Sequence, residues 1–511
     1  MVLDSRPLYA IVTLTCLGLF IALIDTFLPR KRPSFLGWVA AAGALAALGM
    51  DWTAPNGSPW QGILLFDSFS RSFNAVFLIS LAIVCTASAG QEGRMRFAGE
   101  YYALLTFSTI GLMLMASAGG LIALYLGLEL STISLFALVG FSKREKRSAE
   151  AALKMFILGA VASAVILYGT SVIYGVMASS AGNRGSTQFA EIARALQSMH
   201  GGYSWALWLG IAFVVGGLAF KIAAAPFHLW APDVYEGAPA PVSAYLSTAS
   251  KAAAFAVLIR FFVAAVPDAA ERWLPVVIVL AALSMIVGNL VALAQTNLKR
   301  LLAYSGVAQA GYVLVAIAAG PENEMGIGAA FMYLFLYAFT NIGGFLIAQA
   351  IFDATGSDKV TALRGLHRRS PPMAFAMLIV LFSLGGIPPL AGFVGKVYLF
   401  AAGWSGGQHA LVLLGALISV VALYYYLMIA LQVYIRDPDD DRRMPVSRPL
   451  SLAIAACVIA TLAIGIYPRP WVDLGRQAAV ALHSNSTLFM DQRTVGTSAK
   501  RGPAPDRSEG P

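Results

Sequence analysis

The chain is poor in charge and in cysteine. Only 12% of its 511 residues are Asp, Glu, Lys or Arg, whereas 58% are hydrophobic. Soluble globular domains carry about 25% charged residues, so this composition excludes that class of protein. The three cysteines, Cys16, Cys85 and Cys457, lie far apart in apolar segments, and this excludes the spacings that hold zinc or an iron–sulfur cluster. We therefore expect no redox centre and no metal site in the chain.

Two other features are missing from the sequence. No cleavable signal is recognisable, because the first apolar run, residues 7–28, is long enough to span a membrane and is followed by Arg30, Lys31 and Arg32. A nucleic-acid-binding face is not expected either. The net charge is +9, but the basic residues cluster in short loops between apolar segments, where they act as topology signals.

The sequence does contain a series of long apolar runs. Runs of about 20 residues predict an all-α polytopic membrane protein with fourteen transmembrane helices. The predicted helices cover residues 7–28, 34–51, 69–90, 101–118, 120–141, 150–178, 205–230, 240–263, 273–294, 301–319, 326–352, 373–402, 408–434 and 450–468. Loops on one side contain 19 Lys and Arg residues, whereas loops on the other contain 5 and the segment after the last helix contains 6. Because cytoplasmic loops are richer in Lys and Arg, we expect both termini on the periplasmic side of a bacterial inner membrane.

Little of the chain lies outside these helices. The longest external loop, residues 179–204, has apolar residues at helical spacing, which predicts a short amphipathic helix on the membrane face. The last residues, 484–511, are rich in Ser, Gly, Pro and Arg. Because this segment cannot bury a hydrophobic core, we expect a disordered polar tail.

Four of the charged residues stand out because they lie inside the long hydrophobic stretches: Glu129, Lys221, Lys251 and Lys396. A charge at the centre of a transmembrane helix costs about 2.5–3.5 kcal/mol on insertion scales, so such residues are usually functional. At about 4 Å and an effective dielectric of about 20, Glu129 and Lys221 would attract each other by on the order of 4 kcal/mol. Forming and breaking such a pair changes how readily a lysine holds its proton. One carboxylate and three amines at this depth therefore indicate ion or proton transport.

Two predicted helices are interrupted by helix-breaking residues. The seventh contains residues 225–228 (APFH) and the twelfth contains residues 385–389 (GGIPP). In a membrane such a break is tolerated only where protein or water satisfies the freed backbone groups, and paired breaks are typical of inverted-repeat transporters. Because the breaks lie five helices apart, an odd number, helices 4–8 and 9–13 would form two inverted repeats. Two ordinary proline kinks are the alternative. The predicted parts are residues 1–100 (helices 1–3), 101–263 (first repeat), 273–435 (second repeat), 450–470 (helix 14) and 484–511 (tail).

Other polar residues near these charges are candidates for a proton path. We expect Lys251, in the middle of the eighth helix, to be the central relay and Lys396 to be the exit-side group. Tyr333 and Tyr337 could hydrogen-bond connecting water, although polar residues at helical spacing more often join helices. His228 lies beside the first break, where a proton relay and a structural hydrogen bond are both open.

Further polar residues allow two interpretations or favour a structural one. Lys154 lies four residues after Glu150, a spacing that puts both on one helix face. The pair either anchors the helix end or belongs to an access path for protons. Thr340 and Asn341 share the two interpretations given for the tyrosines. Arg260 lies near the end of its predicted helix, and we expect its side chain to reach the membrane interface.

Four segments carry a resemblance to a known family. They are residues 220–242 (FKIAAAPFHLWAPDVYEGAPAPV), 246–253 (LSTASKAA), 298–305 (LKRLLAYS) and 383–393 (SLGGIPPLAGF), the last followed by Lys396. In these segments the chain resembles subunit N of respiratory complex I, the proton-pumping NADH–quinone oxidoreductase. The resemblance is strong over about residues 100–435, and the polar tail departs from it.

This resemblance implies an antiporter-like subunit that couples electron transfer elsewhere in the complex to proton translocation. Position by position, Glu129 and Lys221 match the family's interacting pair, Lys251 its central lysine, and Lys396 its lysine on the second broken helix. The resemblance also implies no cofactor in this chain, with NADH, FMN, iron–sulfur clusters and quinone in partner subunits. The implied partners are the membrane-arm subunits A, H, J, K, L and M, through them the peripheral arm, and the lipid bilayer.

Two alternatives stay open. A subunit of a cation/proton antiporter would share the fold, although such proteins usually differ where this chain has residues 233–237 (DVYEG). A mainly structural element of the membrane arm is the second alternative, and it leaves the buried charges without a purpose.

Overall fold

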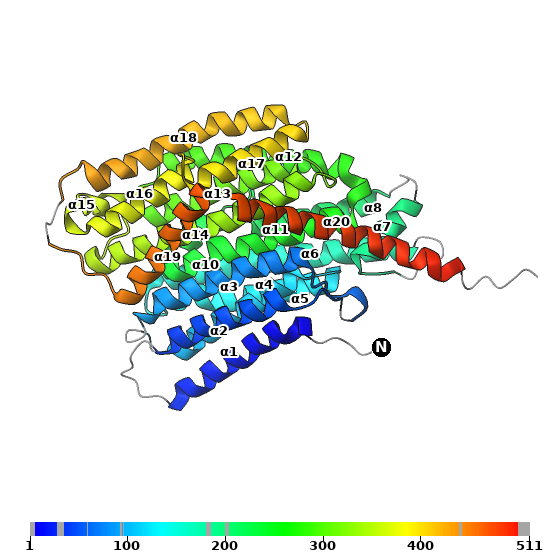
Figure 1. The fold of residues 1–511 in the computed structure, drawn as a ribbon, viewed down its shortest axis with the longest axis horizontal. Helices are drawn as coiled ribbons and strands as arrows, with labels where there is room; N and C mark the ends of the chain where they lie inside the picture. Colours follow the sequence, from blue (N-terminus) through cyan, green and yellow to red (C-terminus); the bar gives the residue numbers. More distant parts are fainter. Residues whose placement is uncertain are drawn as a thin grey trace, which may run out of the picture.

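The structure, a computed structural model, is a nearly all-helical bundle (Figure 1). It describes residues 6–27, 35–58, 60–91, 95, 97–179, 185–199, 204–438 and 442–498. The basic cluster at residues 30–32 and the last part of the predicted tail, residues 499–511, lie outside these ranges. In Figure 1 the helices lie side by side, with α1 (Tyr9–Phe27) at one edge and α18 (His409–Tyr434) at the opposite edge.

Eleven helices of the described ranges are long and apolar enough to cross a membrane, as judged by length and composition. Besides α1 and α18 they are α2 (Phe35–Thr53), α3 (Ser68–Ala89), α5 (Leu121–Val139), α6 (Lys146–Ser179), α12 (Ala270–Leu293), α13 (Leu298–Ile317), α14 (Glu324–Thr355), α19 (Arg448–Ile466) and the compound segment of residues 240–265. A further helix, α4 (Ala98–Ala116), occupies the fourth predicted span. It is less apolar because it carries Glu100, Thr106 and Ser108. The prediction of an all-α polytopic membrane fold is confirmed.

The eighth predicted span is wound irregularly. It consists of α10 (Ala240–Tyr245), the π-helix η4 (Leu246–Ser250), α11 (Lys251–Arg260) and the π-helix η5 (Phe261–Ala265). Single π-turns are rare and are frequently found at functional sites. Together with α14 this segment lies in the middle of the bundle (Figure 1). In the most apolar 18 residues of each, 94% of the residues are buried. Lys251 therefore starts a helix at the centre of the molecule.

Both predicted helix breaks are present. The first half of the seventh span, α8 (Trp205–Lys221), ends before the chain resumes as α9 (Trp230–Gly237). The first half of the twelfth span, α16 (Pro371–Gly385), is followed by α17 (Ala391–Ser405). Gly386 caps α16 with a φ of 83°, a left-handed conformation that favours glycine. The proline and glycine residues of the sequence thus interrupt two helices at matching places.

Side chains satisfy the backbone groups that the breaks set free. The N–H of Ala225 donates to the Ser284 hydroxyl at 2.9 Å, and the N–H of Gly392 donates to the Ser383 hydroxyl at 3.0 Å. In a bilayer no water is available for these donors, so each break depends on a polar side chain of the protein.

Arg260 does not reach the membrane interface, so that prediction is wrong. Its side chain is 1% exposed and makes two hydrogen bonds of 2.9 Å to the carboxylate of Asp67, the N-cap of α3. It also donates to the carbonyl of Ala116 at the end of α4, at 3.1 Å. A buried carboxylate replaces the water that the guanidinium would otherwise need. This ion pair ties α3, α4 and α11 together.

Two of the helices that the structure describes outside the predicted spans bear on the predictions for the external loop and for the tail. The first is α7 (Phe189–Ser198), which confirms the helix predicted in the external loop and packs against η5, with the rings of Phe189 and Phe261 6.0 Å apart. The second is α20 (Arg469–Ser498), whereas the sequence predicts a disordered tail from residue 484.

The long helix α20 crosses the other helices of the bundle in Figure 1, where it is drawn in red. It packs on α14, and the Trp471 ring stacks on that of Phe335 with their centres 4.8 Å apart. Its sequence is too polar to be recognised as a membrane span, because buried residues such as Ala478, Ala479 and Leu482 recur between exposed polar ones such as Arg476 and Gln477.

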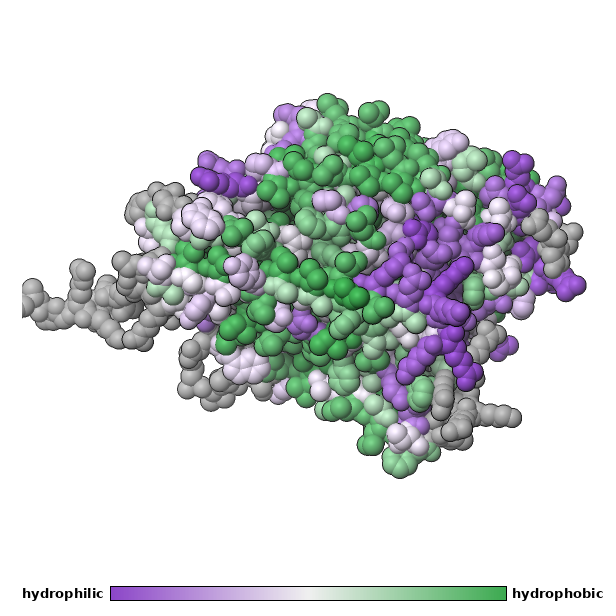
Figure 2. Space-filling model, turned by 180° about the vertical axis from the view of Figure 1, so that it is seen from behind, coloured by the Kyte–Doolittle hydropathy of each residue, from purple (hydrophilic) through white to green (hydrophobic). Residues whose placement is uncertain are grey.

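The surface of the molecule is mostly apolar. Figure 2 shows hydrophobic residues over much of one face, with hydrophilic residues gathered toward one end and extending inward from it. On α18, for example, Leu413, Leu417 and Val420 are more than 60% exposed. Such a surface requires a bilayer or other membrane subunits around it.

Candidate functional site

Lys221 and Glu129 are neighbours in the structure but are not paired. Lys221, the last residue of α8, is half-buried and donates a hydrogen bond to the hydroxyl of Thr132 on α5. Glu129 lies one turn earlier on α5, and its Oε1 is buried without a hydrogen-bond partner in the described protein. The two charges interact electrostatically, yet no ion pair joins them in the part of the chain that the structure describes. The pair is therefore open.

Lys251 is held by a backbone carbonyl. Its side chain is only 2% exposed, and its Nζ donates to the Gly306 carbonyl on α13 at 2.6 Å. The Tyr337 ring centre lies 6.0 Å from the same nitrogen. A Cβ atom at Gly306 would lie 3.2 Å from the Lys251 Nζ and 3.0 Å from the Tyr337 hydroxyl. Glycine at this position gives both polar groups room on the same side of α13.

Lys396 uses the carbonyls that the second break exposes. Its side chain is 5% exposed and donates to the carbonyls of Leu384 at 3.0 Å and Gly385 at 3.3 Å. These carbonyls end α16, where unsatisfied oxygens and the helix dipole favour a cation. The Tyr312 ring lies 4.8 Å from the ammonium nitrogen. The sequence break therefore creates the site for the lysine that follows it.

A line of polar groups connects the surroundings of these two lysines. The Tyr337 ring lies parallel to that of Tyr333, with their centres 6.4 Å apart. The Tyr333 hydroxyl donates to Gln309 Oε1, and Gln309 Nε2 donates at 3.3 Å to the Leu384 carbonyl that also accepts from Lys396. The hydroxyl of Tyr337 has no protein partner among the described residues. Gln309 could not be predicted from the sequence, because a single amide side chain in an apolar helix is common.

Two of the other predicted polar residues join helices, and the third, His228, lies beside the first break. Thr340 lies 3.2 Å from the Ser383 hydroxyl, and the Asn341 amide donates to the Ser247 hydroxyl at 2.7 Å. Both residues join α14 to its neighbours, as the structural interpretation expects. His228 is 6% exposed beside the first break, and its Nδ1 has no hydrogen-bond partner in the described chain.

Lys154 belongs to a separate cluster of charges. Its ammonium lies 2.8 Å from Glu150 on the same helix and 2.7 Å from Asp233 on α9. Asp233 also lies 2.5 Å from Arg300 on α13. Burial acts to raise the pKa of the Asp233 carboxyl, but the hydrogen bonds from Lys154 and Arg300 outweigh it and hold this pKa below its usual range. Asp233 is therefore a carboxylate that bridges α6 and α13.

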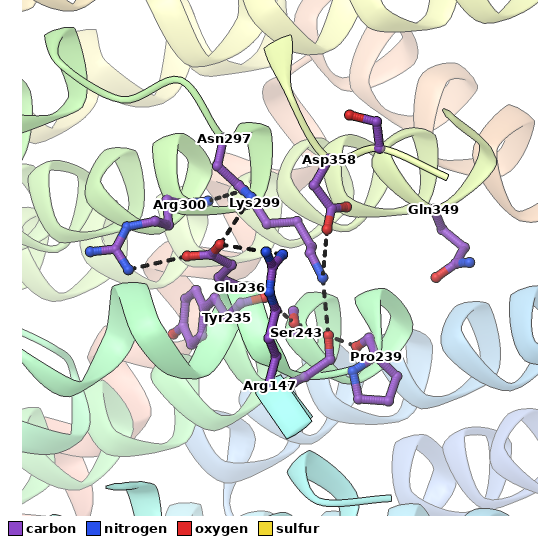
Figure 3. Close-up of polar contacts among 12 residues, drawn as sticks. Arg147, Tyr235, Glu236, Pro239, Ser243, Asn297, Lys299, Arg300, Gln349 and Asp358 are labelled. Carbon is purple, nitrogen blue, oxygen red and sulfur yellow. Dashed lines mark hydrogen bonds and ion pairs between the residues drawn. The ribbon is translucent and has the colours of Figure 1, made fainter. Parts of the chain in front are cut away.

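The cluster continues through the second acid of α9. In Figure 3 the carboxylate of Glu236 lies among Arg300, Asn297 and Arg147, at 3.1, 3.2 and 3.9 Å. Next to it the buried Lys299 reaches the Ala238 carbonyl at 3.3 Å and Asp358 at 3.7 Å. Burial raises the pKa of Asp358, and the Lys299 charge opposes this change only in part. The acids of α9 thus connect the first predicted repeat to the second.

Within the described ranges, no group of three or more His, Cys, Asp or Glu side chains could hold a metal ion. The polar groups that the structure gathers are amines, guanidinium groups, carboxylates, hydroxyls, amides and carbonyls. Among them the amines, carboxylates and hydroxyls can bind or pass protons.

Similarity to known proteins places this arrangement in a family. Residues 118–422 match the family described as NADH:quinone oxidoreductase/Mrp antiporter, transmembrane. The NADH-quinone oxidoreductase subunit N of Moorella thermoacetica is 42% identical over 480 residues, which cover 93% of this chain and 97% of that protein. The chain belongs to the subunit N family. A second member of the broader group, the NAD(P)H-quinone oxidoreductase subunit 2 of Trichormus variabilis, is 38% identical over 515 residues, with coverage of 98% and 96%.

A solved structure agrees with membership of the subunit N family. A chain of the respiratory complex I of Thermus thermophilus, solved with bound aureothin, superposes with a TM-score of 0.76 at 32% sequence identity. The superposition covers 91% of this chain and 98% of that one. The family resemblance inferred from the sequence motifs is confirmed, and the chain is a multi-pass membrane protein.

Proposed function

We propose that this member of the subunit N family is the proton-translocating subunit of an NADH–quinone oxidoreductase. The observation that carries the proposal is the line of groups from Lys251 past Tyr337, Tyr333 and Gln309 to Lys396. In the described chain neither lysine has a carboxylate partner, and a bundle that only holds a complex together has no reason to bury such charges.

A storage role for Lys251 and Lys396 is part of the proposal. Each buried ammonium donates to a backbone carbonyl, which stabilises the charge but does not take up the proton. Transfer therefore requires the proton to leave through a hydroxyl or water, and the Tyr337 and Tyr333 hydroxyls lie where such a step can start. The Glu129–Lys221 pair supplies the charge change that drives it, because opening or closing the pair alters the field at Lys251.

Access to the buried groups belongs to the same proposal. His228 has an unpartnered ring nitrogen at the first break, and Lys154 contacts Asp233 where the hydrophilic cluster begins. Both stay candidates for the path by which protons reach Lys221. The two inverted repeats, with residues 101–263 and 273–435 as their bounds, are the framework that we propose for this path.

Electron transfer is assigned to partner subunits. The proposal places NADH, FMN, iron–sulfur clusters and quinone outside this chain, which acts as a non-redox part of the translocase. The partners are the membrane-arm subunits A, H, J, K, L and M of a complex I, with the peripheral arm beyond them. The complex lies in the inner membrane, with both termini of this chain on the periplasmic side.

The test is a Lys251→Ala substitution in the assembled complex. Membrane vesicles energised with NADH should lose most of their proton uptake, measured with a pH-sensitive dye, and coupled quinone reduction should fall with it. The control is Lys359→Ala, which removes an exposed loop lysine and should leave both rates unchanged. Normal proton uptake by a fully assembled Lys251→Ala complex would overturn the proposal.

A second candidate function follows from the family, because its description also covers Mrp antiporters. In that case the purified chain in liposomes should exchange Na⁺ or K⁺ for protons without a redox substrate. Absence of such exchange, together with NADH-driven uptake in the native complex, separates the two functions. A purely structural role predicts that charge substitutions lower assembly but not proton uptake per assembled complex.

A further inference from the structure

The acceptor that holds Lys221 is a neutral hydroxyl, although a carboxylate lies one turn away. Thr132 and Glu129 are both on α5, three residues apart, so they lie on the same side of that helix. Lys221 donates to the Thr132 hydroxyl, while Oε1 of Glu129 is buried without a hydrogen-bond partner in the described protein. An ammonium would normally pair with the carboxylate, since the opposite charge adds Coulomb attraction that a neutral hydroxyl lacks. In the structure Lys221 is therefore bonded to the weaker of its two nearby acceptors.

The Thr132 hydroxyl is oriented to accept. Its own proton is donated to the carbonyl of Leu128, one turn earlier on α5, at 2.6 Å. This leaves its oxygen lone pairs for Lys221. Threonine often bonds back to its own helix in this way without further contacts. Among the hydroxyls described in the structure, that of Thr132 is the one that in addition accepts from a buried lysine.

Both acceptors are within reach of one lysine side chain. A rise of about 1.5 Å per residue separates residues 129 and 132 by about 4.5 Å along the helix. The flexible four-carbon stem of a lysine covers such a distance by rotamer changes alone. Glu129 is also the charged group that acts on Lys221 in the described chain. The Lys221 amine thus has two possible acceptors, the neutral Thr132 hydroxyl and the charged Glu129 carboxylate.

We propose that Thr132 is a positioning residue that holds Lys221 away from Glu129, and so sets how often this ion pair is open during translocation. The inference rests on the proposed function, because it assigns a control element to the same proton path. A hydroxyl suits this task because it binds the ammonium less strongly than a carboxylate does. The open state is then stable enough to form but is readily reversed.

The test compares three substitutions in the assembled complex. Thr132→Val keeps the shape of the side chain but removes the acceptor, so Lys221 should pair with Glu129 and proton uptake should fall on the order of tenfold, the usual weight of a hydrogen bond to a charged group. The pH at which uptake is fastest should move by about one unit, the equivalent of a tenfold change. Thr132→Ser restores the acceptor and should behave as wild type. Ser131→Ala, next to Thr132 but bonded to Ser108 on α4 at 3.2 Å, is the matched control and should change neither quantity.

A double substitution distinguishes positioning from packing. Once Glu129→Gln has removed the competing charge, adding Thr132→Val should have no further effect on the pH profile. If Thr132→Val prevents assembly, Thr132→Ala carries the same expectation. A wild-type rate and pH profile in assembled Thr132→Val would overturn the inference, as would a Thr132→Ser variant that behaves like the valine variant.

The failure of this inference is separable from failure of the proposed function. If Lys251→Ala stops proton uptake while Thr132→Val does not, the chain translocates protons but Thr132 does not control the pair. If Lys251→Ala leaves uptake intact, the proposed function itself is wrong, whatever Thr132→Val does.

Discussion

The two broken helices hold their lysines in opposite ways. Lys221 precedes its break and ends α8, whereas Lys396 follows its break and reaches back to the carbonyls that end α16. The acceptor of Lys221 is the Thr132 side chain, and the carboxylate of Glu129 lies close by. The acceptors of Lys396 are backbone atoms, and its other neighbour is the face of an aromatic ring.

In the proposed function this difference gives the two halves different tasks. A side-chain acceptor next to a carboxylate offers an ammonium two partners of different strength, so the first site can switch between them. Carbonyls fixed at a helix end offer one arrangement, so the second site holds its charge in place. In the proposed function the same element, a lysine at a broken helix, would thus act as a switch in one half and as a store in the other.

The largest expected effect concerns the backbone of the second break. A Cβ atom at Gly392 would lie 1.8 Å from the Ser383 carbonyl oxygen, so Gly392→Ala forces the two half-helices apart. We expect a loss of more than about 4 kcal/mol, seen as little assembled subunit and a lower melting temperature of the purified complex. The counterpart near the first break is Gly216, where a Cβ atom would meet only the Phe227 ring at 3.9 Å. Gly216→Ala should therefore leave the melting temperature unchanged or slightly higher, and a fall as large as that of Gly392→Ala would remove the contrast between the breaks.

The next effect compares the lysines themselves. Lys221→Met leaves the buried oxygen of Glu129 beside no cation and should destabilise the complex by about 3 kcal/mol. Lys396→Met leaves only helix-end carbonyls without their donor and should cost about 1–2 kcal/mol. Thermal unfolding of the purified complex checks both. Adding Glu129→Gln should restore the stability of Lys221→Met but not that of Lys396→Met, and equal rescue of the two would contradict the assignment of a switch and a store.

The smallest effect concerns the two serines that cap the breaks. Ser284→Ala leaves the Ala225 N–H without its acceptor, and Ser383→Ala does the same for Gly392. Each change should cost about 1 kcal/mol, the low end of the penalty for an unsatisfied buried donor. Hydrogen exchange should become faster at the one amide that each serine caps. Faster exchange throughout both helices would instead show that the serines support the helices and not the breaks.

Much of the fold could be predicted from local properties of the sequence. Long apolar runs identify membrane spans, and the proline and glycine residues at 225–228 and 385–389 identify both breaks, because each effect acts within a few residues. Lys251 and Lys396 stand out for the same reason, since a charge inside an apolar run is rare.

The remaining parts depend on contacts between distant residues. The partner of Arg260 lies 193 residues earlier in the chain. From the sequence only the position of Arg260 near a helix end was known, and this favoured the incorrect prediction of a side chain at the membrane interface. Thr132 and Gln309 look like ordinary polar residues of apolar helices until their partners are known. The helix α20 has too little apolar surface to be recognised before its packing on α14 is seen.

The buried ion pair of Arg260 has a mechanical consequence for the central lysine. Arg260 and Lys251 are the two ends of the same helix, α11. The Arg260 end is fixed to α3 and α4 by hydrogen bonds, whereas the Lys251 end adjoins the π-helix η4. A π-turn holds more residues than an α-helical turn, so a change of η4 to α-helical winding would rotate Lys251 about the helix axis. In the proposed proton path, such rewinding would move the Lys251 amine relative to the Gly306 carbonyl that accepts its hydrogen bond.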